Sequence, residues 1–257
     1  MQETINLNLG IKKSISLGSW ITLAHPAIAE IMAKAGFEWL VVDLEHSTIT
    51  IRETEELIRV IDLCGSKAFV RLTANNPNQI KRVLDAGAHG IIVHMINTPD
   101  DAEKAANAMF YPPKGTRGVG LARAQGYGSE FSHYLKKQSL LQLIVQIEHI
   151  TAVENLESIL SHPCVNGFIV GPYDLSASMH IPGEFKNNLF QSTLRKIENI
   201  AKKYPWVKKG FHLVEPDMLA LEKLIQDNYN FIAYSVDIRL LDVHSRSAVK
   251  QFTRMAT

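Results

Sequence analysis

Three ionisable side chains stand close together in the segment LVVDLEHST, residues 40–48: Asp43, Glu45 and His46. They follow an apolar run that is typical of a buried strand. An imidazole beside a carboxylate suits proton transfer, since the ordinary pKa of histidine lies near ~6.5. His46 is therefore a candidate general base, with Asp43 as its support. A strand that simply surfaces at a solvent-facing loop would show the same pattern.

Two carboxylates, Glu148 of VQIE and Asp174 of GPYD, end two further apolar runs. Both supply hard oxygen ligands, which suit Mg²⁺ or Mn²⁺ when waters and substrate oxygens complete the shell. The pair is a candidate metal site. The alternative is structural, with Glu148 paired to a nearby cation and Asp174 capping the segment LSAS.

Arg71 closes the apolar run FVRL, where a guanidinium is costly to bury unless it meets an anion. Its planar fork suits a carboxylate or a developing enolate oxygen. An internal ion pair with Asp43, Asp85 or Glu148 is the alternative, and it is compatible with a role in the site. Schiff-base chemistry is disfavoured, because no lysine ends an apolar run.

The strands and helices that would bring these residues together can be predicted from the pattern of apolar residues. Short β-rich runs alternate with longer segments of helical period, such as 27–36, 51–65 and 77–87, which end at glycines. Eight such units in one chain predict a (β/α)8 barrel, whose site lies at the carboxyl ends of the strands. A doubly wound open sheet is the runner-up, but no G-x-G-x-x-G turn supports it. The predicted strands are 14–23, 37–44, 67–72, 90–95, 141–148, 165–171, 207–214 and 230–237.

The composition excludes several classes of protein. Across 257 residues, 27 Lys and Arg nearly balance 26 Asp and Glu, which argues against a partner that is nucleic acid or an acidic membrane. No apolar stretch is long enough for a membrane span, and the amino terminus has no apolar signal core. Two cysteines without metal-type spacing favour a reduced, cytoplasmic protein.

Six segments resemble the HpcH/HpaI aldolases, the class II pyruvate-dependent aldolases of the 2,4-dihydroxyhept-2-enedioate and 2-keto-3-deoxy-sugar-acid type. They occur in order between residues 18 and 183, and the final third adds the two expected strands. They read GSWITLAHPAIAEIMAKAGFEWLVVDLEHST, VRL, QIKRVLDAGAHGIIV, YPPKGTRGVG, VQIEH and GPYDLSASMHIPG.

The resemblance implies one barrel domain over residues 1–257, of the phosphoenolpyruvate/pyruvate type. It implies reversible cleavage of a 4-hydroxy-2-oxo acid to pyruvate and an aldehyde through a pyruvate enolate, with a divalent ion, Mg²⁺ or Mn²⁺, for which Co²⁺ is an alternative. By motif, His46 resembles the base, Asp85 the residue that raises its basicity, and Arg71 the stabiliser of the enolate. Asp43 resembles a further catalytic residue. Glu148 and Asp174 resemble the metal ligands, and Gln146, Gly171 and Tyr173 resemble substrate contacts.

The chain departs from the family pattern at His94, His149 and Tyr173, which leaves the aldehyde open. His94, His149 and His212 lie near strand ends, so His46 is not unique by position. The long segment 111–131, with Arg117 and Arg123, resembles loops that close a neighbouring subunit's site. A terminal helix at about 239–255 resembles one exchanged between protomers, although packing on its own barrel is equally compatible with the sequence.

The family expectation for assembly is a hexamer built as a dimer of trimers. Two other functions stay open. One is a citramalate or malyl-thioester type lyase on the same scaffold, and the other is a non-catalytic barrel that binds a keto acid.

Overall fold

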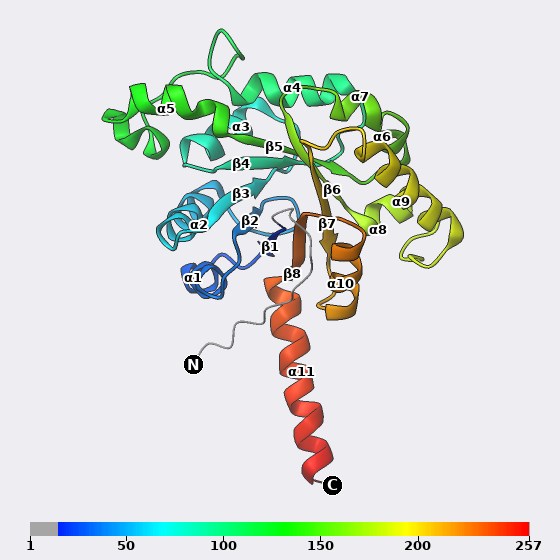
Figure 1. The fold of residues 1–257 in the computed structure, drawn as a ribbon. Helices are drawn as coiled ribbons and strands as arrows, with labels where there is room; N and C mark the ends of the chain where they lie inside the picture. The colour runs from blue at the N-terminus through cyan, green and yellow to red at the C-terminus, as the bar shows by residue number, and fades with distance from the viewer. Residues whose placement is uncertain (1–14, 257) are drawn as a thin grey trace.

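The computed structural model describes residues 15–256. Within them, eight parallel strands pair in sequence order, and β8 returns to pair with β1 (Figure 1). The predicted (β/α)8 barrel is thus confirmed, and each predicted run contains a strand; residue 14 of the first run lies outside the described residues. The strands are β1 (Ser16–Ile21), β2 (Trp39–Asp43), β3 (Lys67–Arg71), β4 (Gly90–Val93), β5 (Gln142–Ile147), β6 (Val165–Val170), β7 (Lys208–Leu213) and β8 (Phe231–Val236).

Helices connect the strands, and the three predicted from periodicity are confirmed as α1, α2 and α3. The glycines Gly36, Gly65 and Gly87 that follow them have φ of 106°, 84° and 104°, the left-handed conformation that ends a helix. The helices are α1 (Pro26–Lys34), α2 (Ile51–Leu63), α3 (Pro77–Asp85), α4 (Pro99–Met109), α5 (Phe131–Lys137), α6 (Ile150–Glu154), α7 (Leu156–Leu160), α8 (Pro172–Ser178), α9 (Asn188–Ala201), α10 (Met218–Gln226) and α11 (Asp237–Ala256), with 3-10 helices η1 (Arg123–Gly128) and η2 (Gln138–Leu140).

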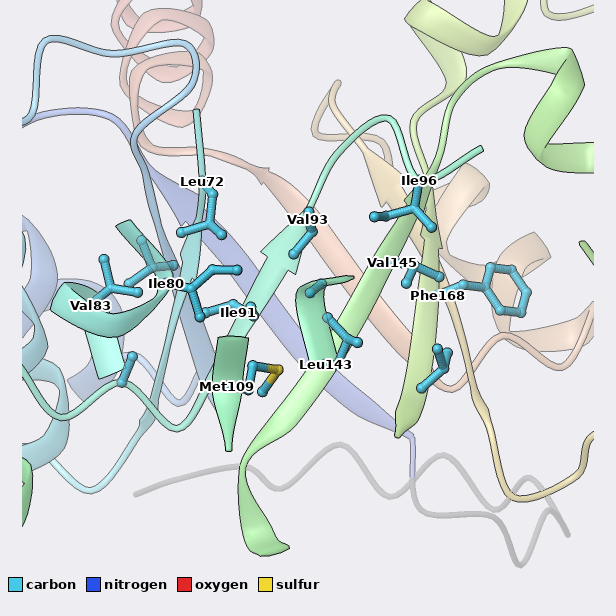
Figure 2. Close-up of a cluster of buried hydrophobic side chains, with 14 of the residues drawn as sticks. Leu72, Ile80, Val83, Ile91, Val93, Ile96, Met109, Leu143, Val145 and Phe168 are labelled. Atoms are coloured by element: carbon cyan, nitrogen blue, oxygen red, sulfur yellow. The ribbon is translucent and has the colours of Figure 1, made fainter. Parts of the chain in front are cut away.

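Side chains of the strands alternate between two apolar layers, as the period of two requires. On β2, Leu40 and Val42 join the outer layer under the helices, whereas Trp39 and Val41 face the barrel interior. Figure 2 shows part of the outer layer, where Ile91 and Val93 of β4 meet Leu143 and Val145 of β5 beside α3 and α4. The alternation carries inward-facing positions up to the carboxyl ends of the strands.

Aromatic rings fill the lower interior of the barrel. Trp39 and Phe231 stack with ring centroids 4.0 Å apart, and Phe69 meets Phe231 edge to face at 5.7 Å. Gly18 of β1 lies against this stack, so a Cβ there would stand 2.1 Å from the Trp39 ring. The filled interior leaves the carboxyl-terminal mouth as the place for chemistry.

The terminal helix α11 leaves the barrel and projects away from it (Figure 1). Among its described residues, Asp237 is the one that is buried, while Ile238, Leu241, Phe252 and Met255 are exposed. No helix within residues 15–256 is both long enough and apolar enough to cross a membrane.

Candidate active site

Arg71 and Asp43 form a buried, two-pronged ion pair at the mouth. They are register partners on β3 and β2, and each lies two residues after an inward-facing side chain of its strand. Arg71 Nε donates to Asp43 Oδ1 at 2.8 Å and Nη2 donates to Oδ2 at 2.6 Å. Burial alone would raise the pKa of Asp43, but the hydrogen bonds and charge of Arg71 outweigh it and lower that pKa. The pair is therefore charged at neutral pH.

Glu45 is a second carboxylate that pairs with Arg71. Its Oε2 lies 3.0 Å from Arg71 Nη1, and its Oε1 lies 3.0 Å from His94 Nδ1. Burial raises the pKa of Glu45, against the lowering effects of Arg71 and His94. Glu45 had no role in the sequence-based assignment, although its spacing of two from Asp43 could have indicated a shared partner.

Glu148 lies buried just beyond the end of β5, with both carboxylate oxygens in use. Oε1 accepts a hydrogen bond from the Met95 backbone N–H at 2.8 Å, and Oε2 accepts one from Gln146 Nε2. Burial would raise the pKa of Glu148, but His94, Met95 and Gln146 together lower it. Hydrogen bonding to the Glu148 carboxylate, with the charge of Glu45 beside it, in turn raises the pKa of His94, whose Nδ1 is 3.7 Å from Oε1.

Asp174 stands on the neighbouring strand connection, in the first turn of α8. Among the described residues no side chain caps that helix, so the capping role suggested for Asp174 is not observed, whereas Glu148 does lie near a candidate cation, His94. Gly171 directly follows β6 and lies close to Glu148, where a Cβ would lie 3.2 Å from Glu148 Cβ. Tyr173 packs edge to face on Phe185 with centroids 5.0 Å apart, and both line a cavity of about 550 Å³ between α9 and α10.

Glu148 and Asp174 have the donor chemistry for a divalent ion held by two carboxylates. Within residues 15–256 no three His, Cys, Asp or Glu side chains are grouped to enclose an ion. Mg²⁺ is commonly held by one or two carboxylates, with water and substrate oxygens completing the shell. Gln146 Oε1 is buried beside Glu148 without a hydrogen-bond partner among the described residues, which marks polar space at this position. Glu148 and Asp174 are thus chemically suited to the ion.

His46 is the exposed member of the group, with 65% of its side chain accessible. Its Nε2 lies 3.9 Å from Glu45 Oε1. Asp43 contacts the backbone of this turn: its Oδ1 accepts the N–H groups of Glu45 at 3.0 Å and His46 at 3.4 Å. The imidazole is therefore placed at the rim of the mouth by a fixed turn.

Asp85 lies away from this group within one chain. It ends α3 just before β4 begins, so it stands at the amino-terminal end of the barrel, opposite the mouth. Its Oδ1 pairs with Arg117 Nη2 at 2.5 Å and lies 3.4 Å from Gln125 Nε2. Arg123, the other arginine of the 111–131 segment, pairs with Asp62 at 2.6 Å. Arg71 accordingly pairs with Asp43 and Glu45, not with Asp85.

Other strand-end groups have structural contacts. His149 caps α6 by accepting the Thr151 N–H at 3.2 Å, and Asp237 accepts the N–H groups of Thr22 at 2.9 Å and Leu23 at 2.8 Å. Sequence reasoning missed Trp20, whose ring lies 5.2 Å from Arg71 Cζ. Alternation along SLGSWI could have indicated that this indole faces inward beside the arginine.

Comparison with known proteins identifies the family. Residues 16–242 match the model of the HpcH/HpaI aldolase/citrate lyase family. A 2-keto-3-deoxy-L-rhamnonate aldolase from Klebsiella pneumoniae is 33% identical over 90% of this chain and 86% of its own length.

Solved structures agree with that match. An HpcH/HpaI aldolase/citrate lyase family protein from Burkholderia cenocepacia superposes with a TM-score of 0.88 at 30% identity, covering 93% of this chain and 95% of its own. An HpcH/HpaI aldolase from Desulfitobacterium hafniense gives 0.85 at 26% identity, with 93% of each chain covered. The chain therefore belongs to the HpcH/HpaI aldolase/citrate lyase family and is an aldolase, a carbon–carbon lyase.

Proposed function

We propose that this aldolase is metal-dependent and reversibly cleaves a 4-hydroxy-2-oxo acid of the 2-keto-3-deoxy-sugar-acid type to pyruvate and an aldehyde. The observation that carries the proposal is the juxtaposition of a fixed guanidinium with a buried acid. Arg71 is held by Asp43 and Glu45, and His94 bridges from Glu45 toward Glu148. The relatives named as 2-keto-3-deoxy-L-rhamnonate aldolases support this substrate class.

Arg71 supplies fixed positive charge at the mouth. Because its Nε and Nη2 are committed to Asp43, its position is set before substrate arrives. Charge that grows on an oxygen near it would be stabilised without reorganisation, typically by about 3–4 kcal/mol for one donor. A divalent ion bound by Glu148 and Asp174 would act as a Lewis acid on the keto group of the substrate. Gln146 and Gly171 lie beside Glu148 and would contact the substrate there.

His46 moves the proton between the C4 hydroxyl group and solvent as the C3–C4 bond breaks. Its exposed position at the rim suits exchange with water. Asp85 can raise the basicity of His46 only from a second subunit, since its own barrel places it at the opposite end. We therefore propose an oligomer in which the amino-terminal face of one barrel covers the mouth of another, with the predicted hexamer as the working assembly.

Metal removal tests the proposal. Treatment with a chelator should abolish two reactions: release of pyruvate from 2-keto-3-deoxy-L-rhamnonate, and exchange of the C3 hydrogens of pyruvate in deuterated water, followed by NMR. Adding Mg²⁺, Mn²⁺ or Co²⁺ should restore both. Full activity in the stripped enzyme would overturn the metal-dependent mechanism.

Glu148→Gln should not be rescued by any of these ions, because it removes a ligand charge. Glu154→Gln, an exposed change in the nearby helix α6, is the matched control and should behave as wild type. A non-catalytic keto-acid binder would show no exchange above background. The expectation of a cytoplasmic location stays a prediction.

A further inference from the structure

His212 of β7 joins three elements inside the mouth. Its Nδ1 accepts a hydrogen bond from the Trp20 indole N–H of β1, and the two rings meet edge to face with centroids 4.8 Å apart. Its Nε2 lies 3.3 Å from the Ser235 carbonyl oxygen of β8. The Ser19 hydroxyl donates to the same carbonyl at 3.3 Å. One imidazole thus connects β7 to both strands at which the barrel closes.

These partners fix the tautomer of His212. A carbonyl oxygen can only accept, so Nε2 carries the proton, and an indole N–H can only donate, so Nδ1 must be bare. The imidazole is therefore neutral. Burial, reinforced by the positive charge of Arg71, lowers the pKa of His212 to about 3, which agrees with this protonation state.

Trp20 carries the effect of His212 to Arg71. The guanidinium Cζ lies 5.2 Å from the indole ring, within the range of cation–π attraction. Asp43 and Glu45 hold the same guanidinium through its nitrogens. An indole whose N–H donates to His212 cannot turn away from the arginine without breaking that part-buried hydrogen bond.

We propose that His212 is a positioning residue for the aldol reaction, which holds the Trp20 indole against Arg71 so that the guanidinium stays aimed at the developing oxyanion. The inference rests on the proposed function of Arg71. His212 touches neither substrate nor ion in this role. Its loss should therefore lower kcat while leaving KM for the oxo acid within about twofold, because the missing alignment matters chiefly in the transition state.

Three variants separate positioning from simple packing. His212→Leu keeps the volume but removes the acceptor, and should lower kcat about tenfold. His212→Asn keeps an acceptor at the place of Nδ1, and should recover most of that loss. Trp20→Phe removes the donor, so Trp20→Phe combined with His212→Leu should be no worse than either alone, since both break the same contact. His133→Leu, an exposed change in α5, is the control.

A readout independent of catalysis is the indole N–H signal in NMR spectra of protein labelled with ¹⁵N-tryptophan. The chain has three tryptophans. Trp39 Nε1 has no hydrogen-bond partner among the described residues, and Trp206 is 69% exposed, so the Trp20 signal should be the strongly hydrogen-bonded one. His212→Leu should move it toward the Trp39 signal, and His212→Asn should not.

The inference is overturned if His212→Leu retains wild-type kcat, or if the Leu and Asn variants lose equal activity. It is also overturned if the Trp20 indole N–H signal does not move in His212→Leu. If wild-type protein shows no aldol cleavage and no pyruvate exchange, the proposed function fails instead. The indole signal would still report whether His212 holds Trp20.

Discussion

Arg71 shows how a single residue is prepared for chemistry by its surroundings. Its buried guanidinium has Asp43 and Glu45 at its nitrogens and Trp20 at its face. Leaving such a group buried without partners would be costly, so the carboxylates make its burial possible. The same contacts fix its direction, which is what stabilisation of a growing oxyanion requires.

A pH dependence of stability follows from His212. Its pKa is about 3 in the folded chain, against about 6.5 for an ordinary histidine. Below pH ~6.5 the unfolded chain binds a proton that the folded chain does not, so the free energy of unfolding falls as pH drops, by at most about 1.4 kcal/mol per pH unit. Between pH 7 and pH 5 this loss is about 2 kcal/mol, and His212→Leu should lack it.

Urea unfolding of wild type and His212→Leu at both pH values, at one protein concentration, measures the difference. His133→Leu should show the wild-type dependence. Asp43, with its lowered pKa, contributes stability that is lost only below its ordinary pKa near ~3.8, so it does not interfere. An identical pH dependence in wild type and His212→Leu would contradict the neutral state of His212.

Residue types at strand ends indicated the members of the candidate site, and they offered the ion pair of Arg71 with Asp43 as one alternative, but they did not indicate the contacts of Glu45. Asp43, Arg71, Glu148 and Asp174 were identified because a charged residue after an apolar run is conspicuous. The contacts of Glu45 with Arg71 and His94 join different strands, so they depend on register and rotamer, which the sequence does not state. Trp20 was missed because an indole in a strand looks like ordinary core.

At the scale of elements, the strand period places every inward group. Phe69 and Arg71 lie two residues apart on β3, so the same alternation that fills the interior also delivers the guanidinium to the mouth. Helix ends were equally predictable, because the glycines after α1, α2 and α3 adopt positive φ. The 111–131 segment was not, since its docking depends on Arg117 reaching Asp85 across the fold.

Gly18 should be intolerant of even one added methyl group. Its Cβ would lie 2.1 Å from the Trp39 ring, which stacks on Phe231 and cannot retreat. Gly18→Ala should therefore lower the free energy of unfolding by about 1–3 kcal/mol through overpacking. Gly118→Ala, where the nearest neighbouring atom is 3.9 Å away, is the matched control and should be nearly neutral. Equal stability of the two variants in urea unfolding would contradict this account of the interior.

At the scale of the whole molecule, the candidate machinery is divided between opposite ends of one barrel. Arg71 and Glu148 lie at the mouth, and Asp85 lies at the far end with Arg117. The sequence could not reveal this division, because the order of the motifs along the chain does not indicate at which end of the barrel each motif lies. A site completed by a neighbouring subunit follows if Asp85 acts on His46.

Mixing inactive subunits tests that arrangement. Arg71→Ala and Asp85→Asn should each reduce turnover by about 10²–10³-fold when pure. Oligomers assembled from equal amounts of both should regain about a quarter of wild-type activity, because some mouths with intact Arg71 meet a neighbour with intact Asp85. Mixing Arg71→Ala with Glu148→Gln should regain nothing, since both changes lie at the mouth of one barrel. A mixture no more active than its components would place the function of Asp85 within one chain.

The projecting helix α11 has a consequence for the order of events in synthesis. All eight strands precede it, and among its described residues Asp237 alone is buried, at the point where the helix leaves β8. Because a chain is synthesised from its amino terminus, all eight strands are made before the apolar residues of α11. Leu241, Phe252 and Met255, which are exposed on α11, therefore join a chain that already holds every strand of the barrel.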